Sequence, residues 1–167
     1  AAGTAELNNT ATLAVISAPD LVPPGLTVAP GGTHHSGDTL TLSWTDQNNG
    51  TVDLGSVFYD GVVVVNTTTA ETLLSTSVSY NPAVPGNGAI SPGGSRTLST
   101  TFRLPDGPRG VGTLQVTINA DAFSQLTELN ASGTAEANNT LMATATSVIA
   151  AYPDLQVINL NVQPGTL

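Results

Sequence analysis

Five carboxylates are the residues best suited to chemistry. Asp121, Glu128 and Glu136 lie in one segment, whereas Asp20 and Asp154 each occupy the centre of a Pro-Asp-Leu tripeptide. Carboxylates, with nearby asparagine and backbone carbonyls, are the oxygen ligands that Ca²⁺ takes in proteins. The five residues are therefore candidate calcium ligands. The alternative is that they provide solubility and hydrogen bonds in turns.

Catalytic chemistry has little support in the sequence. The histidines, His34 and His35, are adjacent in a glycine-rich stretch, and in a strand they would point to opposite faces. We expect them to be solvated loop residues that do not act together. A glycine-rich phosphate loop before a helix and EF-hand spacing are both missing from the sequence. We therefore expect a protein that is not an enzyme and has no cofactor besides the candidate calcium.

Composition and charge exclude further classes. The chain has 167 residues, with 3 Lys+Arg, 12 Asp+Glu, no Cys and a formal net charge of -9. Nucleic-acid binding needs a basic surface, so no such partner is expected. No apolar run approaches the roughly 20 residues of a membrane-spanning helix, so no direct membrane insertion is expected.

The chain contains an internal repeat, which sets its domain organisation. Residues 1–10 and 131–140 are identical at eight of ten positions, and Pro19-Asp20-Leu21 recurs at 153–155. The second match continues with an offset of 134 residues, so about four residues are inserted between the two matches. We expect 1–18 to be the tail of a preceding unit or a donated strand, 19–152 a complete unit, and 153–167 the start of the next. The two ends of the sequence are then not natural termini.

Apolar and polar residues alternate along three segments, a pattern typical of half-buried strands. Leu40, Leu42 and Trp44 share one face of 38–44, and similar alternation occurs over 97–104 and 114–119. Because Trp44 lies on the leucine face, we expect it in the core and not on a ligand-binding surface. The sequence thus indicates an all-β protein.

Turn signals complete the prediction of the fold. Asp60-Gly61, between 57–59 and 62–65, is typical of a tight hairpin turn. Spacing by three residues suggests one helical turn over 122–129, and Gly- and Pro-rich turns separate the other segments. The sum predicts an antiparallel β-sandwich of about seven to nine strands, similar in plan to immunoglobulin or fibronectin type III domains.

An ordered set of short motifs across unit 19–152 resembles the bacterial cell-adhesion-related domain, CARDB. The motifs are Pro19-Asp20-Leu21, the stretch 37–45 followed by Asn49-Gly50-Thr51, the stretch 102–107, and the closing Glu-Ala-Asn-Asn-Thr at 136–140. The resemblance implies an immunoglobulin-like β-sandwich, usually in tandem, in exported surface proteins of bacteria or archaea.

Together these features predict a spacer or stalk module in a tandem array of an extracellular, cell-surface adhesin. Its expected partners are neighbouring repeats of the same chain and possible other copies of itself in a fibre. Two alternatives remain open at this point. One is a subunit of a self-assembling extracellular filament joined by strand donation, and the other is a carbohydrate- or protein-binding accessory module of a secreted enzyme.

Overall fold

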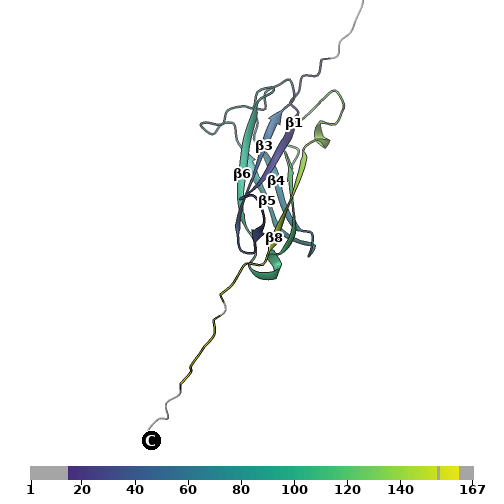
Figure 1. Ribbon diagram of the computed structural model, residues 1–167. Helices are drawn as coiled ribbons and strands as arrows, with labels where there is room; N and C mark the ends of the chain where they lie inside the picture. Colours follow the sequence, from purple (N-terminus) through teal and green to yellow (C-terminus); the bar gives the residue numbers. More distant parts are fainter. Residues whose placement is uncertain (1–14, 154, 162–167) are drawn as a thin grey trace, which may run out of the picture.

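The structure is a computed structural model that describes residues 15–153 and 155–161. These residues form a β-sandwich of two sheets (Figure 1). The smaller sheet has the order β1-β3-β6 and the larger one the order β2-β8-β7-β4-β5. The strands are β1 (Leu21–Ala29), β2 (His34–His35), β3 (Thr39–Asn48), β4 (Phe58–Asn66), β5 (Glu71–Tyr80), β6 (Ser95–Arg103), β7 (Gly112–Asn119) and β8 (Thr140–Val148). The predicted all-β sandwich is confirmed, with eight strands in the described residues.

The core lies between the two sheets and is built from alternate residues of each strand. On β3, Leu40, Leu42 and Trp44 are buried, as their alternation predicts, and the inward residues of β7 are equally buried. Full burial of one such side chain contributes about 1.5–3 kcal/mol. Because Trp44 is only 1% exposed, it is a core residue, and its predicted placement is confirmed.

The predicted hairpin at Asp60-Gly61 is wrong, because β4 runs straight through both residues. Gly61 pairs with Ser77 of β5 on one side and with Asn119 of β7 on the other. Asp60 points into the core, where its carboxylate accepts hydrogen bonds from Trp44 Nε1 at 2.6 Å and from the Asp121 backbone N–H at 3.1 Å. These tertiary partners override a turn preference that depends on two residues alone.

The histidines lie in β2, which pairs in parallel with Ser147 and Val148 of β8. Their side chains take opposite faces, as expected of a strand, but only His35 is exposed. His34 is buried, so the expectation of two solvated loop residues is wrong for His34. The cause is the pairing with β8, which turns one of the two adjacent residues inward.

The chain enters the sandwich at one end and leaves it at the opposite end. The segment that precedes β1 lies at the upper end in Figure 1, and the segment that follows β8 leaves from the lower end. Short 3-10 turns occur at Gly107–Gly110 and Ala135–Ala137, but 122–129 forms no helical turn. None of the described helices is long and apolar enough to cross a membrane.

Two carboxylates are enclosed in the core near Trp44. Asp46 and Asp60 are both fully buried, and their carboxyl groups are hydrogen-bonded to each other, with Asp46 as the protonated donor and Asp60 as the acceptor. Burial, reinforced by the charge of Asp60, raises the pKa of Asp46 to about 9. Burial also raises the pKa of Asp60, against the hydrogen bond from Trp44. The core therefore holds Asp46 in its neutral, protonated form near neutral pH.

This protonation makes stability depend on pH. The folded chain keeps the Asp46 proton up to about pH 9, whereas the unfolded chain loses it near the ordinary value of 3.8. The folded state thus binds more protons across this interval, and its stability falls as the pH rises, by at most roughly 1.4 kcal/mol per pH unit. Asp46→Asn, which cannot ionise, should flatten the profile of unfolding free energy against pH. Exposed Asp53→Asn is the control, and equal slopes for Asp46→Asn and the native chain would contradict the assignment.

Candidate functional site

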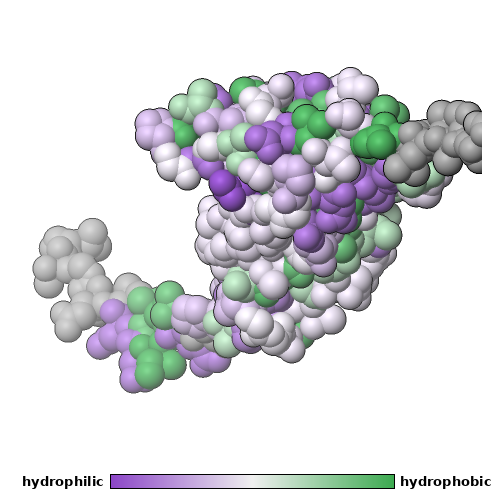
Figure 2. All heavy atoms as spheres, turned by 90° about the horizontal axis from the view of Figure 1, so that it is seen from above, coloured by the Kyte–Doolittle hydropathy of each residue, from purple (hydrophilic) through white to green (hydrophobic). Residues whose placement is uncertain are grey.

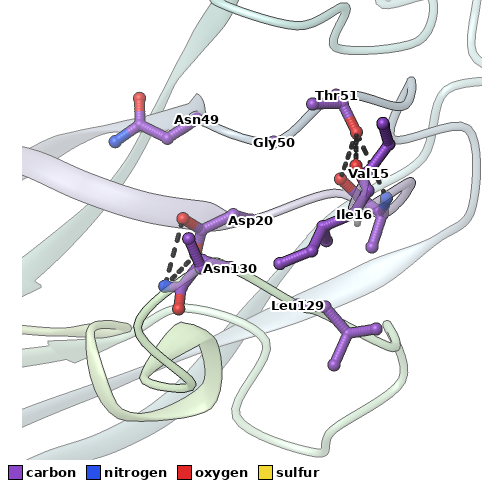
Figure 3. A pocket seen from close by; sticks show the side chains of 10 residues that line it. Val15, Ile16, Asp20, Asn49, Gly50, Thr51, Leu129 and Asn130 are labelled. Atoms are coloured by element: carbon purple, nitrogen blue, oxygen red, sulfur yellow. Dashed lines mark hydrogen bonds between the residues drawn. The ribbon is translucent and has the colours of Figure 1, made fainter. Parts of the chain in front are cut away.

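The segment 15–20 lies across the upper end of the sandwich and lines a hollow of about 340 Å³ (Figure 3). We call this hollow the linker site. Two loops form its other walls, one containing Asn49-Gly50-Thr51 and the other Leu129-Asn130-Ala131. Val15, Ile16 and Ala18 supply apolar surface from the incoming chain. The site therefore holds the chain just before it enters the first strand.

Backbone hydrogen bonds fix the incoming chain on both sides. The Thr51 N–H donates to the Ala18 carbonyl at 2.8 Å, and Thr51 Oγ1 donates to the Ile16 carbonyl at 2.8 Å. The Asn49 N–H donates to the Asp20 carbonyl at 2.7 Å, and the Leu129 N–H donates to the Pro19 carbonyl at 3.1 Å. The linker is thus held as part of the domain, much as a strand would be.

Asp20 and Glu128 anchor the same segment through their side chains. The Asp20 carboxylate accepts from Asn138 Nδ2 at 2.9 Å and from Asn130 Nδ2 at 3.4 Å. Glu128 Oε2 accepts from the Leu21 backbone N–H at 2.6 Å, and its other oxygen accepts from Asn139 Nδ2 at 3.3 Å. Both carboxylates are buried. Each one therefore serves as an acceptor for donors from distant parts of the chain.

The predicted calcium ligands are partly brought together. Asp20 lines the linker site. Glu128 and Glu136 line a second hollow that shares Leu129 and Asn130 with it, and there Glu136 Oε1 accepts from the Glu128 N–H at 3.3 Å. Asp121 instead holds a turn, accepting from the N–H groups of Gln125 and Leu126 at 2.9 and 2.8 Å. Asp154 lies outside the described residues.

These carboxylates do not fit a cation well in their present arrangement. Within 15–153 and 155–161, no group of three or more His, Cys, Asp or Glu is placed to hold a metal ion. The oxygens of Asp20 and Glu128 already accept from internal N–H donors, and a ligand set for Ca²⁺ needs those lone pairs. The geometry favours the alternative role, in which the acids make hydrogen bonds in turns and caps. Calcium binding stays a prediction.

The electrostatics of Glu128 follow from its position. Burial raises the pKa of Glu128 to about 7, and the charges of Glu136 and Asp121 add to the effect. The hydrogen bonds from Leu21 and Asn139 act in the opposite direction. The hollow beside the linker site therefore contains a carboxyl group that changes its charge near neutral pH.

Two residues that bond to Asp20 and Glu128 were not identified from the sequence, although a signal for them was present. Asn138 and Asn139 belong to the repeated decapeptide, whose copy carries Asn8 and Asn9 at the matching positions. Glu136, one of the predicted calcium ligands, likewise matches Glu6. The copy at 1–10 lies outside the described residues.

The lower end of the sandwich also holds the chain. The hydroxyl of Tyr152 accepts from the Gly107 N–H at 2.8 Å and lies 3.1 Å from Ser36 Oγ. Ser36 Oγ also accepts from the Ala150 N–H at 3.0 Å. The chain is therefore bound to the domain both where it arrives and where it leaves.

Comparison with known proteins agrees with this architecture. No protein-family model matches the sequence, and no curated protein matches it either. A crystal structure of the CARDB domain of the PF1109 protein from Pyrococcus furiosus, in complex with di-metal ions, superposes with a TM-score of 0.56. It is 15% identical and covers 82% of this chain and 100% of its own.

The chain has the fold of a CARDB domain. The solution NMR structure of the same Pyrococcus furiosus domain gives a TM-score of 0.53 at 14% identity, and covers 81% of this chain and 100% of its own. The resemblance seen in the sequence motifs is thus confirmed at the level of the CARDB fold. At this identity the likeness concerns the fold, and the linker site of this chain is argued from its own residues.

Gly50 is the residue at which the linker site tolerates least change. A Cβ on Gly50 would lie 2.5 Å from the Asp20 backbone nitrogen and would also overlap the Ala18 carbonyl oxygen. Because backbone cannot give way easily, we expect Gly50→Ala to lower the free energy of unfolding by about 1–3 kcal/mol. Gly55→Ala is the matched control, since nothing lies within 4 Å of a Cβ there. Thermal unfolding of both variants measures the effect, and equal midpoints would contradict this tight packing.

Glu128→Gln tests the buried carboxyl group. The folded chain keeps the Glu128 proton up to about pH 7, whereas the unfolded chain loses it near 4.5. Stability contributed by this group is therefore complete below about pH 4.5 and is lost as the pH rises toward 7. Glu128→Gln cannot ionise and should lack this loss. The free energy of unfolding of Glu128→Gln minus that of the native chain should therefore be larger at pH 8 than at pH 4. Chemical denaturation at both pH values, with Asp53→Asn as the control, measures the difference. A constant difference between the native chain and Glu128→Gln would rule out this titration.

Proposed function

We propose that the chain is a non-catalytic structural module that acts as a spacer or stalk in a tandem array of an extracellular surface protein from a bacterium or archaeon. The observation that carries the proposal is the placement of the two chain ends. The chain arrives at one end of the sandwich and leaves from the opposite end (Figure 1). Units joined in this way add their lengths along one axis.

The contacts at each end support a stiff connection between units. Tyr152, which precedes the second Pro-Asp-Leu, is hydrogen-bonded to Gly107 of this unit. In the second Pro-Asp-Leu, Asp154 and Leu155 match Asp20 and Leu21. If the next unit holds Asp154 as this unit holds Asp20, only Pro153 lies between the two anchored residues, Tyr152 and Asp154. Proline has a fixed φ angle and adds little freedom. The partners of the chain are then its neighbouring repeats, and adhesion is the role of the whole array.

A chain of two units tests the proposal. Residues 1–152 followed by 19–161 place a second unit after the natural junction. We expect small-angle X-ray scattering to give a maximum dimension roughly twice that of one unit, because the junction extends along the long axis of the sandwich. A compact particle with two units side by side would contradict the spacer role.

Two additions sharpen this experiment. Thr51→Ala in the second unit removes the hydroxyl that donates to the incoming carbonyl and should broaden the distribution of shapes, whereas exposed Thr69→Ala should not.

Melting scans with chelator and with added Ca²⁺ address calcium, since a ligand that binds only the folded state must raise the midpoint. An unchanged midpoint would remove calcium from the proposal.

A further inference from the structure

The segment 155–161 carries large apolar side chains that the rest of the described chain does not cover. Leu155, Val157, Ile158 and Leu160 are 91%, 84%, 75% and 80% exposed. Figure 2 shows hydrophobic surface on the arm that leaves the body of the domain. Soluble proteins seldom expose so many large apolar residues in one short stretch without a partner.

The internal repeat indicates what covers this segment. With the offset of 134 residues, Leu155 matches Leu21, Val157 matches Pro23, and Leu160 matches Leu26. In this unit Leu21 and Pro23 are buried, and Leu26 packs against the core. Three of the four exposed side chains thus match side chains that β1 places on the core, whereas Ile158 matches the exposed Pro24.

The surface that receives β1 is well defined in this unit. β1 pairs antiparallel with β3, with Leu21 opposite Asn48, Leu26 opposite Trp44 and Thr27 opposite Ser43. The Leu21 N–H is held by the buried Glu128. β1 forms one edge of its sheet, so β3 would be an open edge without it.

We propose that residues 155–161 form the first strand of an adjoining sandwich. The partner surface is the open edge of a β3-type strand in a further copy of this unit, with Leu155 in the position of Leu21. This inference rests on the proposed function and names the contact through which successive units are joined. Residues 155–161 are then the opening strand of the next unit, which follows this one without a spacer.

The sequence of the segment suits that edge better than β1 itself does. β1 contains Pro23 and Pro24, which lack an N–H, and its pairing with β3 shifts register between Val22 and Gly25. The matching residues Val157 and Ile158 each have an N–H and are β-branched, as strands prefer. The same edge can therefore pair with 155–161, and a register shift like the one that β1 has between Val22 and Gly25 would keep both Leu155 and Leu160 on the core face.

A hybrid chain tests the inference. Residues 1–161 followed directly by 28–161 give a second unit in which 155–161 stands where 21–27 would be. The control is the two-unit chain of 1–152 followed by 19–161, which keeps the native β1. Hydrogen–deuterium exchange of the amides of 155–161 is the measurement, because paired strand amides exchange slowly and uncovered ones do not.

The expected result is that 155–161 exchange fast in the single chain and at least about 100-fold more slowly at the hybrid junction, approaching β1 of the control. Leu155→Asp at that junction should remove the protection, whereas the same change at the free C-terminal copy should have no effect on either unit. Fast exchange at the junction, with β1 protected in the control, would overturn the inference. Failure of the proposed function is distinguishable, because the control chain would then be folded but not extended.

Discussion

The hydrogen bond from the Leu21 N–H to Glu128 is the interaction on which the upper end of the structure depends. It spans 2.6 Å and joins residues 107 positions apart in the chain. Leu21 begins the edge strand of the smaller sheet, and Glu128 lies in the long loop between β7 and β8. A buried acceptor that loses its donor costs about 1–3 kcal/mol. The strand and the loop therefore hold each other in place, and the linker site forms between them.

Strand β3 connects this site with the core. Its inward residues begin with Leu40 and Leu42 and pass through Trp44 and Asp46 to Asn48, so the buried face changes from apolar to polar along one strand. Asn48 accepts from the backbone N–H groups of Asp20 and Gly50 and donates to the Ile90 carbonyl. The polar end of the core is thus hydrogen-bonded to two residues that line the linker site. Strand β3 therefore connects the segment 15–20 directly with the leucines of the core.

The sequence predicted the parts of the structure that depend on local pattern. Alternation placed Leu40, Leu42 and Trp44 in the core, because a strand buried on one face needs only its own periodicity to be recognised. The hairpin at Asp60-Gly61 and the exposure of His34 were wrong, because each depended on a partner strand far away in sequence. The acids of the linker site were identified by residue type, yet their role as acceptors required Asn138, Asn139 and Leu21. Spatial neighbours of this kind leave no local pattern, although the repeated decapeptide already contained two of them.

The three arginines all have partners within the domain, which leaves uncompensated negative charge on the chain. The chain has 3 Lys+Arg against 12 Asp+Glu. Arg103 pairs with Asp106, Arg109 pairs with Glu71, and Arg96 donates to the Asn87 carbonyl. Each arginine therefore has a partner within the domain, and the uncompensated charge is negative. In the proposed array this charge repeats with every unit, and like charges at repeated intervals favour the extended form over a collapsed one. Apolar burial at each junction and repulsion along the surface then act together, since the first joins the units and the second keeps them apart elsewhere.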